Sequence, residues 1–104
     1  MSGELLRFLG LMRRAGKLEA GEAGVKRAVL SGKARRILLA ADASPNAVKR
    51  AEAFSARTGV PIIRLDSIKP ELSGATGTAG VAMYAICDEG FSQAFEKKMI
   101  QTSE

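Results

Sequence analysis

The sequence predicts an α/β domain in which one β-sheet lies between layers of helices. Three observations lead to this prediction. Segments with helical spacing of apolar residues alternate with short apolar runs. Glycine or proline stands at most junctions between them, so the connections are short. The length of 104 residues is that of one domain, which we expect to span residues 1–104 with an ordered part of about 4–100.

The first third of the chain predicts two helices joined by a short strand. Apolar residues at i, i+3, i+4 and i+7 predict one buried helix face, formed by Leu5, Phe8, Leu9 and Met12. Gly16 is a residue type that commonly ends such a helix, and Lys17–Glu19 is short enough to be an edge strand. Gly21-Glu22 opens the second helix and Gly32 closes it. Its inward face is predicted to be Val25, Ala28 and Val29.

Two strands and one helix are predicted between positions 36 and 65. Arg36–Ala41 is a nearly continuous apolar run, which suits a strand covered on both faces. Ser44-Pro45 combines a capping serine with a first-turn proline and so predicts a helix start. Gly59 ends this helix, and Pro61–Leu65 predicts the next strand.

The last third predicts a short helix, a loop, a strand and a final helix. Ser67 is a candidate cap for a short helix that runs to Leu72. The small residues Ser73–Gly80 then predict a loop, and Val81–Ile86 the last strand. Asp88 is the predicted cap of the final helix, whose apolar face is formed by Phe91, Ala94, Phe95 and Met99.

Positive charge is concentrated at one end of the sequence. Residues 1–36 carry nine lysine or arginine residues and three acids, a net charge of +6. Residues 37–104 carry seven basic and eight acidic residues, a net charge of −1. Such a basic third is typical of nucleic-acid binding. Charge alone leaves open the alternative of a solvated basic surface that serves solubility.

Scarce residue types exclude several kinds of site. Histidine is absent, which excludes a histidine base and an ordinary transition-metal site, and the one cysteine, Cys87, has no partner for an internal disulfide. No apolar run approaches the ~18 residues of a membrane span, and Met1–Arg7 lacks the features of a signal peptide. We therefore expect a cytoplasmic protein that needs no metal or cofactor and does not associate with a membrane.

Three other features are better explained by structure than by chemistry. Gly74, Gly77 and Gly80 are spaced like a phosphate-binding loop, but they lack the Walker lysine and precede a strand, so a tight turn is the better explanation. Cys87 has no histidine to activate it and suits a small buried residue. Asp88 suits a helix cap. No pair of carboxylates indicates acid–base catalysis.

The candidate binding site is the basic turn and helix start within Arg13–Gly32. A helix N-terminus presents unpaired N–H groups and a partial positive charge, and basic side chains beside it favour phosphates or base edges. Arg27 is the central candidate because a guanidinium can bond bidentately to guanine or phosphate. The alternative for Arg27 is a solvated charge on an amphipathic helix. If RNA binds, phosphate contacts are predicted for Lys17, Lys26, Lys33, Arg35 and Arg36.

Several short motifs occur in an order that resembles one known family. They are Arg14-Ala-Gly-Lys-Leu, Gly21-Glu22, Lys26-Arg27-Ala28-Val29, Ser31-Gly-Lys-Ala, Leu38-Leu-Ala-Ala-Asp-Ala-Ser, Gly59-Val-Pro, Leu72-x-x-Ala75-x-Gly77 and Asp88-Glu-Gly-Phe. From about Leu5 to Met99 the chain resembles the bacterial YlxQ branch of the ribosomal protein L7Ae/L30e family. The resemblance implies a three-layer α-β-α sandwich around a four-stranded mixed sheet. It also implies binding to kink-turn RNA, a sharply bent internal loop with an extruded base.

The resemblance further implies where RNA is bound. In the family the start of the second helix reads guanines, and the loop that corresponds to Leu72–Gly80 packs against the extruded nucleotide. Gly21 matches the glycine at the helix start, and Arg27 takes the place of a lysine that contacts RNA. Ala75 and Gly77 match the loop.

The helix start departs from the family pattern at two positions. The family's Asn-Glu pair falls on Ala23 and Gly24, so two polar contacts are missing. Backbone N–H groups remain available, and Glu22 could partly replace the lost contacts. The departure weakens the expectation of tight, guanine-specific binding, since a lost partner at a base edge costs about 1–3 kcal/mol.

Together these arguments predict a non-catalytic RNA-binding protein that is monomeric and ribosome-associated. Its ligand would be kink-turn or similarly bent structured RNA, such as ribosomal RNA. A second hypothesis is a protein-interaction module on the same scaffold with only nonspecific RNA affinity, and a small enzyme is the weakest alternative. The predicted RNA-binding residues are Lys17, Gly21, Glu22, Lys26, Arg27, Lys33, Thr76, Gly77 and Thr78.

Overall fold

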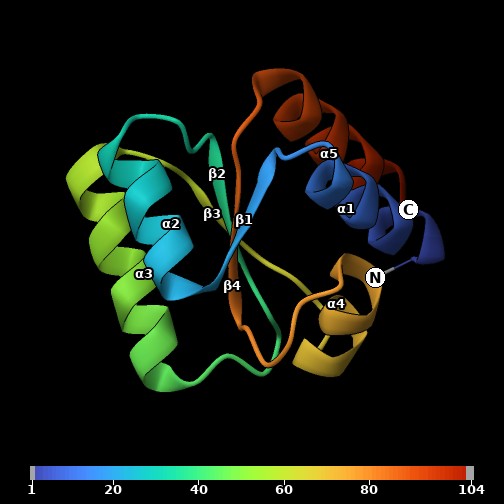
Figure 1. Cartoon of the computed structure of the whole chain (residues 1–104), viewed down its shortest axis with the longest axis horizontal. Helices are drawn as coiled ribbons and strands as arrows, with labels where there is room; N and C mark the ends of the chain where they lie inside the picture. The colour runs from blue at the N-terminus through green and yellow to red at the C-terminus, as the bar shows by residue number, and fades with distance from the viewer. Residues whose placement is uncertain (1, 103–104) are drawn as a thin grey trace.

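A computed structural model of the chain describes residues 2–102. Within them, five helices and four strands alternate, and the strands form one sheet in the order β1-β4-β2-β3 (Figure 1). β2 and β3 are parallel, whereas β4 is antiparallel to both β1 and β2. The bounds are α1 Gly3–Arg14, β1 Leu18–Ala20, α2 Gly21–Leu30, β2 Arg36–Leu39, α3 Pro45–Thr58, β3 Ile62–Arg64, α4 Lys69–Thr76, β4 Met83–Ile86 and α5 Glu89–Thr102.

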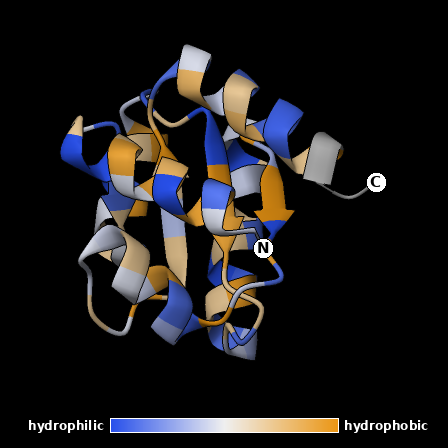
Figure 2. Cartoon of the chain, turned by 90° about the vertical axis from the view of Figure 1, so that its right-hand side faces the viewer, coloured by the Kyte–Doolittle hydropathy of each residue, from blue (hydrophilic) through white to orange (hydrophobic). Residues whose placement is uncertain are grey.

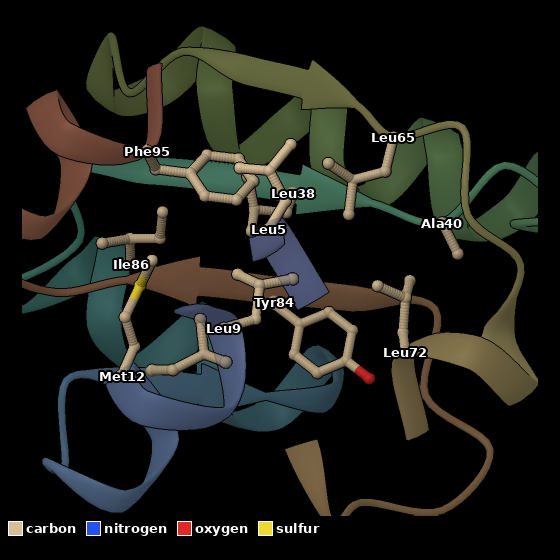
Figure 3. Packing of buried hydrophobic residues seen from close by; sticks show 11 residues of the cluster. Leu5, Leu9, Met12, Leu38, Ala40, Leu65, Leu72, Tyr84, Ile86 and Phe95 are labelled. Atoms are coloured by element: carbon tan, nitrogen blue, oxygen red, sulfur yellow. The ribbon is translucent and has the colours of Figure 1, made fainter. Parts of the chain in front are cut away.

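Helices cover both faces of the sheet, with α2 and α3 on one side and α1, α4 and α5 on the other (Figure 1). Alternation along the strands builds a core on each side. In β2, Leu38 packs with α1, α4 and α5, while Ile37 and Leu39 pack with α2 and α3. Figure 3 shows the first of these clusters, in which Tyr84 and Phe95 are the largest members. The predicted three-layer sandwich with a four-stranded mixed sheet is therefore confirmed.

The two apolar runs of the sequence form the two central strands. β2 and β4 each have a strand on both sides and helices on both faces, so three residues of β2 and all four of β4 are buried. This environment explains why Arg36–Ala41 lacks the alternation of a half-exposed strand. β1 and β3 lie at the two edges of the sheet, as the short Lys17–Glu19 segment predicted for β1.

In three helices, α1, α3 and α5, a side chain caps the first turn. Leu5 N donates to Ser2 Oγ at 3.2 Å, Ala47 N donates to Ser44 Oγ at 3.1 Å, and Phe91 N donates to Asp88 Oδ2 at 2.9 Å. Each of these bonds satisfies one N–H that has no partner inside the helix. The predicted caps at Ser44 and Asp88 are confirmed.

The predicted bounds of the helix within residues 67–80 were wrong. α4 begins after Ile68, and it continues four residues beyond the predicted end at Leu72. Its first N–H groups are held by carboxylates, since Ile68 N donates to Glu71 Oε1 at 3.0 Å and Lys69 N donates to Asp42 Oδ1 at 2.9 Å. The loop predicted to begin at Ser73 therefore begins at Gly77, whose φ of 71° ends α4. We call residues 77–82 the α4–β4 loop.

Close contact between α1 and α4 explains why this small-residue segment is helical. A Cβ placed on Gly10 would lie 2.5 Å from the carbonyl oxygen of Ala75. The helices therefore approach so closely that only glycine fits at position 10. Leu72, fully buried in the same cluster as Leu9, adds apolar burial to the contact. This packing compensates for the low helix propensity of Ser73, Gly74 and Thr76.

Candidate nucleic-acid interface

The start of α2 differs from those of α1, α3 and α5 because no side chain caps it. Its N-cap residue is Ala20, which has no side-chain acceptor, and Gly21 has a φ of 85°. The N–H groups of the first turn are therefore available to an external acceptor, and they carry the positive end of the helix dipole. Such a terminus is suited to bind an anion or an electron-rich base edge.

The α4–β4 loop lies beside this helix start. A Cβ placed on Gly21 would lie 3.4 Å from Cγ1 of Val81, which follows Gly80 in the loop. Because β4 pairs with β1, the beginning of β4 and the end of β1 meet at the same end of the sheet. Gly21 therefore lies beside Val81, near the end of the α4–β4 loop.

Three hydroxyl groups fix the loop to the sheet. Thr78 Oγ1 lies 3.0 Å from the Tyr84 hydroxyl and 2.9 Å from Thr76 Oγ1. Thr76 is buried and donates to Leu72 O at 2.7 Å. Thr76, the last residue of α4, directs its side chain into this cluster, whereas it was predicted to contact RNA. It positions the loop, whereas Gly77 is exposed and Thr78 half-buried.

Removing the tyrosine hydroxyl tests this cluster. Tyr84→Phe keeps the ring, which is 1% exposed, and leaves Thr78 with Thr76 as its remaining partner. We expect a loss of about 1 kcal/mol in the free energy of unfolding, together with faster amide hydrogen exchange in the loop. Denaturant unfolding and hydrogen exchange would measure the two effects. Exchange no faster than in the wild type would mean that the loop is held by its backbone alone.

Arg27 lies on the outer side of α2 and is accessible. Its side chain is 73% exposed and forms an ion pair with Glu19 at 3.8 Å. The guanidinium lies back toward the helix start, because one of its nitrogens is 3.8 Å from where a Cβ on Gly24 would be. An exposed pair of this kind contributes little to stability, so Arg27 can exchange Glu19 for a phosphate or base at small cost.

A hollow of about 660 Å³ runs beside Arg27 between α2 and the edge strand β1. Its lining includes the cations Arg27 and Lys33, the carboxylate Glu19, and the less polar Leu30 and Cys87. Burial, and secondarily the Glu19 carboxylate, raises the pKa of the Cys87 thiol. The thiol is therefore protonated at neutral pH, and it supplies the hollow with a weakly polar wall rather than a nucleophile.

The structure separates the remaining predicted lysines from the helix start. Lys17 O accepts from Cys87 N at 2.8 Å, which places Lys17 where β4 ends rather than where it begins. Lys33 N donates to Ala28 O at 2.9 Å, which places Lys33 at the end of α2 opposite Gly21. Among the predicted residues, Lys26 and Arg27 are exposed along α2. Gly21 lies at one end of this helix, and Lys17 and Lys33 lie at the other.

Sequence reasoning missed Arg50, which the fold brings to the helix start. Arg50 on α3 donates to Glu22 Oε2 at 2.6 Å, so the first turn of α2 carries a guanidinium from the neighbouring helix. Glu22 is engaged in this pair and is not a free acceptor. No local pattern reveals the pair, because its members are 28 positions apart and meet only when α2 packs on α3.

The two neighbouring arginines that were predicted as phosphate contacts, Arg35 and Arg36, both pair with α5. Arg36 is only 15% exposed at its side chain, and it donates to Ser92 Oγ at 2.9 Å and to Glu96 Oε2 at 3.0 Å. Arg35 pairs with Glu89 at 3.7 Å. Both side chains therefore connect the start of β2 to α5.

Residues 2–102 contain no group of three or more cysteine or acidic residues placed to hold a metal ion. None of the helices described is both long enough and apolar enough to cross a membrane.

The fold and this surface define a small basic α-β-α protein with an uncapped helix start beside a loop. The chain belongs to the Ribosomal protein L7Ae/L30e/S12e/Gadd45 family, whose model matches residues 4–96. Comparison with curated protein sequences finds no match.

Two solved structures share the architecture. One is a protein of unknown function from Bacillus halodurans, with 26% sequence identity and a TM-score of 0.82 over 92% of this chain and 96% of that chain. The other is described as a 15.5kD RNA binding protein of Giardia lamblia, with 20% identity and a TM-score of 0.73 over 93% of this chain and 86% of that one. Both likenesses support the fold.

Proposed function

We propose that this chain is a non-catalytic RNA-binding protein that recognises kink-turn or similarly bent structured RNA. The observation that carries the proposal is the uncapped start of α2 beside the α4–β4 loop, with Arg27 exposed on the same helix. Membership of a ribosomal protein family supports it, as does the likeness to a protein described as RNA binding. We further propose the YlxQ-like bacterial branch, a cytoplasmic location and association with the ribosome.

The recognition we propose combines shape with charge. The N–H groups at Gly21 and its successors would donate hydrogen bonds to a base edge or phosphate, and Arg27 would supply a second, bidentate contact. The α4–β4 loop, held by Thr76 and Tyr84, would pack against a nucleotide that leaves the stack. A surface fitted to the bent form shifts the RNA population toward that form. Lys26 and Lys33 would add salt-dependent affinity.

A titration against two RNAs tests the proposal. One RNA contains a kink-turn and the other is a straight duplex of equal length, and each titration is repeated at several salt concentrations. We expect tighter binding to the kinked RNA, with a preference that persists as salt rises. Equal affinity for both RNAs that falls steeply as salt rises would mean that only nonspecific attraction to the basic surface remains. That result would favour the protein-interaction module instead.

Restoring the family's polar pair provides a gain-of-function test. Ala23 is exposed. Gly24 is buried, but a Cβ on it would make only ordinary contacts, the nearest at 3.4 Å to Oε1 of Glu19. Ala23→Asn with Gly24→Glu should therefore fold, and it should gain helix propensity at position 24. We expect kink-turn affinity to rise at least about 5-fold, the equivalent of one base-edge contact. A fall in affinity would mean that this chain uses another surface or another RNA.

A further inference from the structure

A second basic surface lies on the layer of helices opposite α2. Figure 2 faces this layer, where hydrophilic and hydrophobic residues alternate along the helices. A hollow of about 310 Å³ is lined here by Glu4, Arg7, Phe8, Leu11, Arg14 and Lys98. We call Arg7, Arg14 and Lys98, with Phe8 and Leu11, the α1–α5 patch. The basic residues of the first third of the chain thus divide between two faces of the molecule.

The packing of α5 on α1 fixes one side of the patch. Lys98 Nζ donates to Glu4 Oε1 at 2.7 Å and lies 5.3 Å from the centre of the Phe8 ring. The Phe8 ring in turn contacts the edge of Phe91, with 5.6 Å between ring centres. The hydrogen bond and charge of Lys98 hold the pKa of Glu4 below its usual value. Glu4 therefore compensates Lys98 at neutral pH.

Arg7 and Arg14 are the two positive charges of the patch that form no ion pair within the described residues, and Glu4 interacts only weakly with Arg7. Both arginines are exposed. They are seven residues apart on α1, which places them on one face of the helix about 10 Å apart. A double helix carries several phosphates over that length. A guanidinium is also the cation best shaped for bidentate contact with phosphate.

We propose that the α1–α5 patch binds the phosphate backbone of an RNA duplex, so that the protein holds two RNA segments at once. The inference rests on the proposed function for the segment bound at α2. A duplex fits the patch better than a protein partner does. Among the residues that line the hollow, Leu11 is the one large apolar side chain that is exposed, at 46%. A stable protein interface needs more than this, namely an apolar centre within about 1,200 Å² or more of buried surface.

The test adds a labelled straight RNA duplex to the preformed complex of the protein with an unlabelled kink-turn hairpin. The variant is Arg7→Gln with Arg14→Gln, which keeps an unbranched polar side chain and a similar helix propensity while removing both charges. The matched control is Lys49→Gln with Arg57→Gln, which removes two exposed charges from α3. We expect the wild type and the control to bind the duplex. The Arg7 and Arg14 variant should bind it about 10-fold more weakly, with a slope of log K against log salt about 2 smaller.

Hairpin affinity separates this inference from the proposed function. It should be unchanged in the Arg7 and Arg14 variant. Equal duplex binding by that variant and the wild type would overturn the inference, as would a wild-type complex that binds no duplex. Duplex binding that needs both arginines, in a protein that does not prefer the hairpin, would support the patch while overturning kink-turn recognition. Preference of the patch for a polyglutamate peptide over the duplex would overturn it in favour of an acidic protein.

Discussion

Replacing Gly10 by alanine is expected to lower the free energy of unfolding by about 2 kcal/mol and the melting temperature by about 8–16 °C. The new Cβ would lie 2.5 Å from the carbonyl oxygen of Ala75, and a backbone atom cannot move aside as a flexible side chain can. α1 and α4 would have to separate, which loosens the contacts of Leu9 and Leu72. This cost exceeds the roughly 1 kcal/mol that alanine gains over glycine inside a helix. Thermal and denaturant unfolding would measure it.

Gly74→Ala is the matched control for Gly10→Ala. Gly74 lies inside α4, the partner helix, yet a Cβ placed on it meets no atom within 4 Å. The same substitution should therefore stabilise the protein by about 0.5–1 kcal/mol through helix propensity. A stabilising effect at both positions would mean that α1 and α4 separate without cost, and that the close contact is unimportant.

Arg27→Ala is expected to weaken binding of a kink-turn RNA by about 10- to 100-fold, which corresponds to roughly 1–3 kcal/mol. The substitution should leave unfolding nearly unchanged, because the side chain is 73% exposed and its ion-pair partner, Glu19, is 3.8 Å away at the surface. A titration beside a melting curve separates these effects. Arg27→Lys would retain the charge but not the bidentate geometry.

Arg57→Ala provides the control for general loss of positive charge. Arg57 is exposed in the last turn of α3, the helix beside α2, and its removal changes the net charge by the same amount. We expect at most a small, salt-dependent loss of affinity. If Arg27→Ala and Arg57→Ala weaken binding equally, Arg27 contributes only to the overall field and not to a specific contact.

Most of the fold could be predicted because local patterns and tertiary packing agree. The apolar stripe from Leu5 to Met12, the cap at Ser44 and the apolar run of β2 each indicate the element that forms. At residues 67–80 the local pattern and the tertiary packing disagree. Small residues and glycines predicted a loop, but the contact between Gly10 and Ala75 favours a helix. A contact between positions so far apart leaves no periodic signal in the sequence.

The candidate site could be predicted less completely, for the same reason. Gly21 and Arg27 follow from the pattern around one helix start, and they lie where that pattern indicates. The roles of Arg36 and Arg50 depend on which carboxylate or hydroxyl the fold places beside each, as Ser92 and Glu22 illustrate. The count of lysine and arginine residues along the chain therefore overestimated how many side chains are free to contact RNA.

Tyr84 gives the protein an intrinsic optical reporter. It is the sole tyrosine of a chain without tryptophan, so near-ultraviolet emission at tyrosine wavelengths comes from one ring. That ring is 1% exposed, and its hydroxyl is 3.0 Å from Thr78 in the α4–β4 loop. Movement of the loop would change the hydrogen bonding of the hydroxyl, and with it the emission yield. Loop rearrangement can therefore be followed in the unlabelled wild-type protein, with Tyr84→Phe as the blank.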